Sequence, residues 1–221
     1  VMDGNVNIKL VSFALCPFVQ RSVILLDKKR IEYELEYIDL EQPPEWFKRL
    51  SPMGKVPLML VGDEVLFESS VILDYLDESY DPRFHPQDTL RRAQHKAWIE
   101  FGSALLMTQH GLATATDREA VLEKKQQLEA DLGQLTSPLK QGLFGGAGQF
   151  SLVDAAYAPL FMRFDQLARF DPIGQVSYPE PVAAWAARLL SLPSVRGSVV
   201  DDFSDRYRRF LEQKDAWLVR A

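Results

Sequence analysis

Cys16 is the only cysteine among the 221 residues, and it stands directly before Pro17, where a segment of alternating polarity gives way to a helical pattern. A thiol is nucleophilic only as its thiolate, and the unpaired N–H groups of a helix N-terminus lower its pKa. Pro17 suits the first helical position because its missing N–H would be unpaired there anyway. Arg21, one turn further on, adds positive potential. A small buried cysteine is the alternative, but this position favours a reactive thiol.

The residue three positions after Cys16 is Val19, so this segment resembles the CxxC of redox proteins without its second cysteine. An outside thiol must therefore complete any disulfide cycle. A single cysteine also excludes an intrachain disulfide and a cysteine-rich zinc site. It fits a reducing compartment, where a thiol can stay free.

Two further segments could hold a peptide-like ligand. Residues 54–57 (Gly-Lys-Val-Pro) would carry a cis Val56–Pro57 bond that turns the backbone of Val56 towards a bound peptide, although an ordinary turn into a strand is the simpler interpretation. Glu68 and Ser69 stand between a strand and a helix. There a serine hydroxyl and helix N–H groups can hold a carboxylate, and Glu68 can pair with an amine. A plain helix cap explains the same residues equally well.

The elements that must position these residues follow from the hydrophobic periodicity. We expect strands at residues 8–13 and 33–40, a hairpin of strands 56–61 and 64–67, and helices at 16–29, 44–50 and 68–79. This order, βαβ-α-ββα, predicts an α/β domain over residues 1–80. Residues 81–87 contain two prolines and are predicted to be a linker.

Everything after the linker has helical periodicity, which predicts an all-α domain over residues 88–221. The expected helices cover residues 88–111, 117–135, 151–170 and 179–192, with two shorter ones towards Trp217. Trp98, Phe101, Leu105 and Leu106 form an apolar stripe, most of which we expect in the core and part of which could face a cleft between the domains. Trp217 could close that cleft, or simply pack.

Composition and charge exclude several functional classes. Hydrophobic residues make up 47% and charged residues 25%, and the net charge is −6, which argues against sequence-independent nucleic-acid binding. No segment approaches the roughly 20 apolar residues of a membrane span, and no signal peptide is visible at the start, so we predict a cytoplasmic protein. His85, His95 and His110 lack metal-ligand spacing, which predicts no metal site and a separate surface role for each.

The glycine-rich loop at residues 142–148 follows no strand, so it predicts a turn before the next helix and not a phosphate loop.

Taken in order, the segments of the first domain resemble the cytosolic glutathione transferases, and they are most similar to the cysteine-containing omega class. The matching segments are residues 16–21, 44–47, 54–57, 68–69 and 73–78. In the second domain Ser151 and Asp154 match the capping box before the family's central helix, in which each side chain bonds the other's backbone N–H. Its staple would be weak, because Phe150 would meet only the small Ala155.

The resemblance implies a thioredoxin-like domain that binds glutathione, followed by a helical domain that carries the acceptor-substrate site. It implies glutathione as co-substrate, no metal, and a homodimer. By the same resemblance Cys16 is the catalytic residue that faces the glutathione sulfur. The implied glutathione-binding residues are Phe18 at the sulfur, Val56 at the cysteinyl backbone, and Glu68 and Ser69 at the γ-glutamyl end. Pro57, Ser151 and Asp154 are implied structural residues.

One contact of the omega pattern is missing. Pro43 occupies the place where that pattern often has a lysine for the glycyl carboxylate. Lys55 is the obvious substitute, although a solvated lysine is the simpler interpretation.

The implied function is glutathione-dependent thiol transfer or reduction through a Cys16 mixed disulfide with glutathione. The acceptor is a small-molecule or protein disulfide, and dehydroascorbate reduction follows only from the resemblance. Conjugation to electrophiles should be weaker, because Ser12 is the only nearby hydroxyl and lies on the strand. The alternative is a non-enzymatic interaction protein on the same fold, similar to stringent starvation protein A. That protein lacks the cysteine, which favours an enzyme here.

Overall fold

A four-stranded mixed sheet forms the first part of the computed structural model, which describes residues 7–146 and 148–220. The strands are β1 (Ile8–Ser12), β2 (Glu34–Tyr37), β3 (Leu58–Val61) and β4 (Glu64–Phe67), in the order β2-β1-β3-β4. β1 runs parallel to β2 and antiparallel to β3, and β3 and β4 form the predicted hairpin. The helices of this part are α1 (Pro17–Lys29), α2 (Glu45–Leu50) and α3 (Ser69–Ser79).

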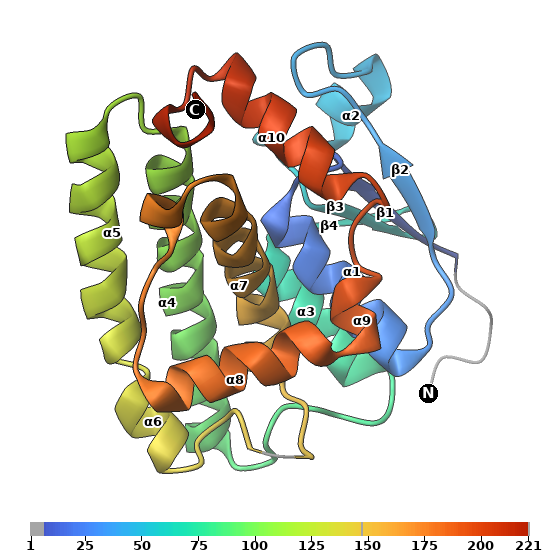
Figure 1. The fold of residues 1–221 in the computed structure, drawn as a ribbon. Coiled ribbons are helices and arrows are strands. Elements are labelled where there is room, and N and C mark those ends of the chain that lie inside the picture. Colours follow the sequence, from blue (N-terminus) through green and yellow to red (C-terminus); the bar gives the residue numbers. More distant parts are fainter. Residues whose placement is uncertain (1–6, 147, 221) are drawn as a thin grey trace.

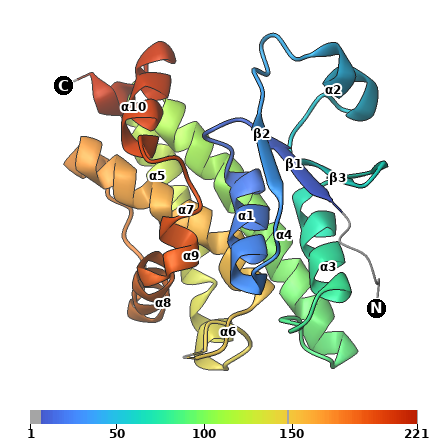
Figure 2. The same cartoon turned by 90° about the vertical axis from the view of Figure 1, so that its right-hand side faces the viewer.

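The two faces of the sheet pack against different helices because the side chains of a strand alternate. Leu10 and Met59 belong to the large core that includes the apolar residues of α1 and α3. Val11 and Leu58 lie on the other face and pack against Phe47 of α2. Figure 2 shows α1 between the sheet and the helices of the second part, and α2 at the upper right, away from those helices.

The rest of the chain is helical. Its α-helices are α4 (Thr89–Thr114), α5 (Arg118–Gly133), α6 (Thr136–Lys140), α7 (Leu152–Phe170), α8 (Glu180–Ser191), α9 (Pro193–Arg196) and α10 (Phe203–Gln213). Two short 3₁₀ helices, η1 (Pro172–Gly174) and η2 (Trp217–Val219), complete it. α7 is the central helix, in contact with α4 on one side and α1 on the other (Figure 1). None of the helices described is both long and apolar enough to cross a membrane.

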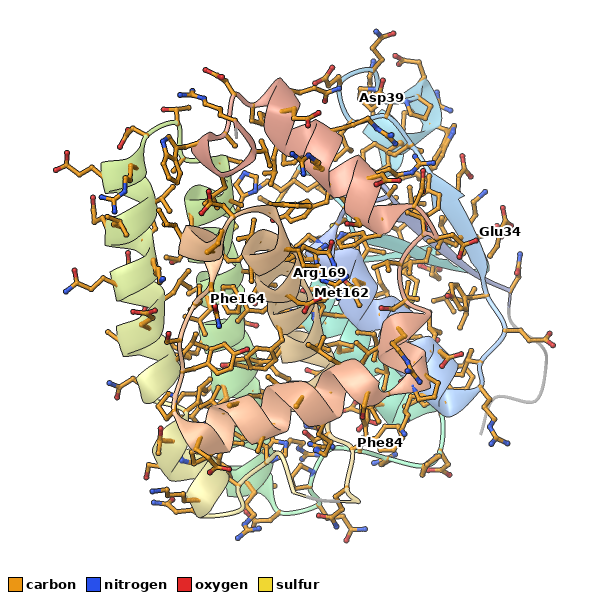
Figure 3. The ribbon with its side chains drawn as sticks, in the orientation of Figure 1. Glu34, Asp39, Phe84, Met162, Phe164 and Arg169 are labelled. Atoms are coloured by element: carbon orange, nitrogen blue, oxygen red, sulfur yellow. The ribbon has the colours of Figure 1, made fainter. Side chains whose placement is uncertain are left out.

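α7 begins with the expected capping box. The backbone N–H of Ser151 donates to Oδ2 of Asp154 at 2.7 Å, and the N–H of Asp154 donates to Oγ of Ser151 at 3.4 Å. Asp154 is fully buried, and its Oδ1 also accepts from Nε1 of Trp185 and Nη2 of Arg188. Phe150 packs edge-to-face on Phe84, with 5.2 Å between ring centroids, at the end of the molecule away from α10 (Figure 3).

A buried ion pair holds the segment between the two parts. Nζ of Lys29 in α1 lies 3.0 Å from Oδ1 of Asp77 in α3, and it also donates to the carbonyl oxygens of Tyr80 and Pro82. The carboxylate of Asp77 accepts the backbone N–H groups of the next residues, Phe84 and His85. Both charges are therefore satisfied without water, as burial requires.

Three sequence-based expectations change. α6 and η1 were not predicted, and β2 occupies only the first part of the expected strand. The prediction of surface roles for His85 and His95 is wrong, because both are buried and their rings lie 5.9 Å apart. His85 binds Asp74 at 3.0 Å and His95 binds the carbonyl of Leu143 at 2.7 Å. Their burial follows from contacts with segments distant in the sequence, Asp74 for His85 and Leu143 for His95, which periodicity does not reveal.

The glycine-rich loop acts in packing. Gly145 has φ +74°, and a Cβ there would collide with the side chain of Leu139 and press on the ring of Trp185. A residue without a side chain is needed at this position for both reasons.

Candidate active site

Cys16 lies between the end of β1 and the first turn of α1, as the sequence predicts. Its backbone N–H donates to the carbonyl of Phe13 at 3.1 Å, and its carbonyl accepts the first helical bond, from Gln20 at 3.2 Å. Cys16 is therefore the N-cap residue, and the helix start aims its unpaired N–H groups at the side chain. The residue is only 6% exposed.

The expected low pKa of this thiol is not what the environment produces. Burial raises the pKa of Cys16, because the apolar surroundings disfavour the thiolate. The N–H groups of Val19 and Phe18 and the charges of Arg163 and Arg21 lower it, but their sum is smaller than the effect of burial. The helix start therefore acts in the predicted direction, and the sequence could not show how deeply the sulfur is buried.

Arg163 of α7 is the cation that the sequence analysis missed. Its Nη2 donates to the carbonyl of Leu15 at 2.7 Å, and its Nη1 donates to Oε1 of Gln20 at 2.7 Å and to the carbonyl of Pro159. Arg163, which belongs to the second part of the chain, is therefore hydrogen-bonded to residues before and after Cys16. Burial lowers the pKa of Arg163 to about 10, which still leaves it charged at neutral pH. The only signal in the sequence is a charged residue in an otherwise apolar run of α7.

Arg21 is fully buried behind Cys16. Its Nε donates to the carbonyl of Ala156 at 3.1 Å, and its Nη1 donates to Oγ of Ser103 at 2.8 Å and to Oγ of Ser69 at 3.3 Å. The predicted positive potential near Cys16 is therefore present. The same guanidinium also links the thiol helix to the first residue of α3.

The predicted ligand-binding residues of the first domain line one cavity of about 320 Å³, which we call the Glu68 cavity. Its lining is Phe18, Ser51, Pro52, Met53, Lys55, Val56, Pro57, Phe67, Glu68, Ser69 and Met107. The structure thus brings together Phe18, Lys55, Val56, Glu68 and Ser69, which lie far apart in the sequence. Val56 and Pro57 are both part of this lining, and the bond between them is cis.

A second cavity of about 310 Å³, the Cys16 cavity, adjoins the first. It is lined by Phe13, Leu15, Cys16, Pro17, Phe18, Leu40, Gly54, Lys55, Val56, Leu106, Met107, Gln109, His110, Arg163, Tyr207 and Phe210. Four residues line both cavities: Phe18, Lys55, Val56 and Met107. A ligand in the Glu68 cavity can therefore reach towards Cys16 past these shared residues, and a second molecule has room on the other side.

Glu68 has an unusual backbone at the mouth of the Glu68 cavity. Its φ is +71° and its ψ is 121°, a region that residues with a side chain rarely adopt. Such a conformation costs about 1–3 kcal/mol and persists where the surrounding structure imposes it, often at functional sites. Its side chain is exposed, and the next residue, the buried Ser69, begins α3.

Several expected contributors lie outside both cavities. Pro43 does not line either cavity, and Oγ of Ser12 donates to the carbonyl of Phe13. Trp98 and Phe101 pack on each other, and the backbone N–H of Trp217 donates to Ala115. Trp217 lines neither cavity and packs against the large core, so of the two alternatives simple packing holds.

The C-terminal residues that do line the Cys16 cavity are Tyr207 and Phe210 of α10. Of the four residues of the predicted apolar stripe on α4, only Leu106 is in this lining. Among the residues described, no three His, Cys, Asp or Glu side chains are grouped to hold a metal ion.

Comparison with known proteins identifies the family. A family model described as the glutathione S-transferase N-terminal domain matches residues 15–79. The omega-1 glutathione S-transferase of Rattus norvegicus is 27% identical over 93% of the chain and 85% of the rat protein. The crystal structure of glutathione transferase Omega 3C from Trametes versicolor superposes with a TM-score of 0.77 at 26% identity, covering 96% of this chain and 93% of that one. The chain belongs to the glutathione transferase superfamily.

Within this superfamily the chain is omega-like, as its sequence motifs predict, and it is a glutathione transferase enzyme. Over a shorter stretch, which covers 45% of this chain, the identity is higher: 42% to pyrimidodiazepine synthase of Drosophila melanogaster, of which it covers 43%. Rice GST1, solved in complex with glutathione, has the same fold, with a TM-score of 0.82 at 24% identity over 96% of this chain and 99% of that one. The predicted fold class, a thioredoxin-like part followed by a helical part, is confirmed.

Proposed function

We propose that this glutathione transferase is a glutathione-dependent thiol transferase and reductase that works through a mixed disulfide between Cys16 and glutathione. The observation that carries the proposal is the arrangement of two adjoining cavities. One contains the five predicted glutathione-binding residues, and the other contains the only cysteine of the chain. Phe18 and Val56 line both, so they would flank the sulfur of a bound glutathione.

The Glu68 cavity offers a partner for each end of glutathione. Glu68 would pair with the γ-glutamyl amine, and Ser69 with the N-terminal N–H groups of α3 would bind the γ-glutamyl carboxylate. Arg21 already donates to Oγ of Ser69, so the hydroxyl hydrogen of Ser69 is left to donate to that carboxylate. The backbone of Val56 would hold the cysteinyl unit. Lys55 is exposed on the same wall and would bind the glycyl carboxylate in place of the lysine absent at Pro43.

The chemistry needs two thiol–disulfide steps. The Cys16 thiolate attacks the glutathionyl sulfur of a mixed disulfide; a Cys16–glutathione disulfide forms, and the other thiol leaves with the electron pair and takes up a proton. The thiolate of a second glutathione then attacks the glutathionyl sulfur on Cys16. Oxidised glutathione leaves, and Cys16 is restored. No second cysteine of the chain takes part, in agreement with the sequence.

The lining of the Cys16 cavity favours an apolar acceptor. Apart from Cys16, most of its side chains are aliphatic or aromatic, and its polar members are Lys55, Gln109, His110, Arg163 and Tyr207. Mixed disulfides with an apolar or aromatic group should therefore react better than small polar acceptors. Dehydroascorbate reduction remains part of the proposal, with the expectation that it is the slower activity.

We also keep as proposals the division into residues 1–80, 81–87 and 88–221, with the acceptor site in the last of these. The homodimer and the cytoplasmic location stay predictions from the sequence and its resemblance.

Mass spectrometry after incubation with oxidised glutathione tests the mechanism. We expect one glutathione per chain, bound to Cys16 and released by reduced glutathione, and no adduct on Cys16→Ser. Because burial raises the pKa of the thiol, adduct formation should accelerate with rising pH. A wild-type protein that forms no adduct at any pH up to 9, or an adduct that persists in Cys16→Ser, would overturn the proposal.

A further inference from the structure

The buried thiol of Cys16 poses a problem that the two steps above leave open. Burial keeps the sulfur protonated at neutral pH, and a thiol must lose its proton to attack. The proton needs an acceptor within reach of the cavity, and the departing thiolate needs a donor. An acid–base residue that serves both needs would allow turnover near neutral pH.

Four titratable side chains besides Cys16 line the Cys16 cavity: Lys55, His110, Arg163 and Tyr207. Lys55 and Arg163 are cations and cannot take up a proton. Tyr207 is buried, and its hydroxyl accepts from Nε2 of Gln109 at 2.9 Å; burial raises its pKa, so it stays neutral. His110 is left as the one group in this described lining that can accept and release a proton near neutral pH.

His110 is placed to do so. It lies on α4 with Leu106 and Met107, and it lines the same cavity as Cys16 at the start of α1. Within the described part of the chain, no ring nitrogen of His110 is held in a hydrogen bond, and the residue is exposed. Its ring lies 6.1 Å from that of Phe210, and Nζ of Lys214 lies 5.7 Å from the same phenyl ring on α10.

The surroundings of His110 keep its imidazole in the form of a base. Partial burial of the ring and the positive charge of Lys214 lower the pKa of His110 below its ordinary value. Of the other charged side chains, Arg163 of α7 and Lys55 line the same cavity as His110, and both are also positive. At neutral pH the imidazole is therefore uncharged and has a lone pair available.

We propose that His110 is the acid–base residue of the Cys16 cavity, taking the proton of the Cys16 thiol and passing it to the departing thiol. The inference rests on the proposed thiol transfer and adds a catalytic residue to it. Sγ of Cys16 gives its proton to the imidazole, directly or through one bound water, and attacks the glutathionyl sulfur. The S–S bond to the acceptor breaks, its sulfur leaves with the electron pair, and His110 returns the proton to it. In the second step His110 takes the proton of the incoming glutathione and delivers it to Sγ.

The pH profile of thiol transfer tests this role. A neutral imidazole is required, so the rate should fall as the pH drops through the pKa of His110, which burial of the ring and, to a smaller extent, the charge of Lys214 hold below its ordinary value. In His110→Gln this acid limb should disappear, with a loss of about 100-fold in kcat at pH 7. At high pH, where the thiolate forms without a base, the variant should approach the wild-type rate. Equal rates and equal profiles in both proteins would overturn the proposal.

A second variant tests the same group without removing it. Lys214→Met removes the cation that adds to the effect of burial in lowering the pKa of His110, so the acid limb should move part of the way to higher pH while the rate on the plateau changes little. Lys140→Met, an exposed lysine at the end of α6, is the matched control and should leave the profile unchanged. An acid limb that stays in place in Lys214→Met would contradict the assignment to His110.

The outcome of these tests is separable from that of the thiol-transfer mechanism. If wild type forms no Cys16–glutathione adduct, the proposed function fails, whatever His110 does. If the adduct forms at the same rate and with the same pH dependence in His110→Gln, the thiol-transfer mechanism stands and the role of His110 is refuted.

Discussion

At the scale of single residues, opposing influences meet at Cys16 and at Glu68. A helix start and two buried guanidinium groups act to lower the pKa of the Cys16 thiol, yet the effect of burial is larger and raises it. Glu68 keeps a backbone conformation that favours glycine, at the mouth of the cavity where glutathione is proposed to bind. The raised pKa of one residue and the strained backbone of the other both occur beside the two cavities. Perturbed ionisation and backbone strain are often found at functional sites.

Replacing Glu68 by glycine should separate stability from binding. Glu68→Gly relieves the left-handed backbone, so we expect an unchanged or higher free energy of unfolding, by up to about 1 kcal/mol. The same change removes the proposed partner of the γ-glutamyl amine, so affinity for glutathione should fall at least about 10-fold. Calorimetric melting and titration with glutathione measure the two effects.

Glu68→Gln is the matched control for that variant. It keeps the strained backbone and removes only the charge, so it should weaken binding without any gain in stability. A glycine variant that binds glutathione as tightly as wild type would show that Glu68 has no part in the site.

At the scale of elements, α7 sets the position of α1, the helix that begins at Cys16. It presents the Arg163 side chain to the residues beside Cys16, and its Ala156 carbonyl accepts from Arg21. The start of α7 is in turn fixed by Asp154, whose carboxylate bonds Ser151, Trp185 and Arg188. The cap of one helix in the second part therefore influences the geometry of a thiol in the first.

Removing the two cap side chains of α7 should have unequal effects. Ser151→Ala loses a cap hydrogen bond and should lower the free energy of unfolding by about 1 kcal/mol. Asp154→Ala also leaves buried donors of Trp185 and Ser151 unpaired, so we expect a loss of about 3 kcal/mol or more. Denaturant unfolding gives both values.

An exposed cap provides the comparison. Asp117 caps α5 through the N–H of Ala120 alone, so Asp117→Ala should cost about 1 kcal/mol. If Asp154→Ala were no worse than Asp117→Ala, the buried network around Asp154 would not stabilise the fold as argued.

At the scale of the whole molecule, the sheet and the helical part share one core. The larger cluster of buried apolar residues runs from Ile8 in β1 to Val219 in η2 without division. The arginine bonds between α7 and α1 and the Lys29–Asp77 pair at the linker add polar links across the same region. The two parts are distinct in topology and continuous in packing.

This continuity predicts one cooperative unfolding transition. Trp46 reports on the first part and Trp185 on the second, so fluorescence of single-tryptophan variants and calorimetry should give coincident midpoints. Gln20→Leu, which removes a bond partner of Arg163, should lower that midpoint for both probes together. Two separate transitions in wild type would contradict a shared core.

The sequence predicted the features that depend on local signals. Pro17 at a helix start and Ser151 with Asp154 at another are short-range patterns, and the elements they mark lie where expected. The predicted glutathione-binding residues line one cavity because motifs fix their places on a known fold. The depth of Cys16, the burial of His85 and His95, and the approach of Arg163 depend on contacts between distant segments. No local pattern encodes those contacts.

The bonds from Arg163 to Leu15 and Gln20 have a consequence for recombination between relatives. A chimera that joins the first 80 residues of one family member to the helices of another would inherit a thiol without the side chain that braces it, unless positions 20 and 163 came from the same parent. The linker looks like a natural crossover point. The residues on either side of the thiol make inheritance of the two halves interdependent.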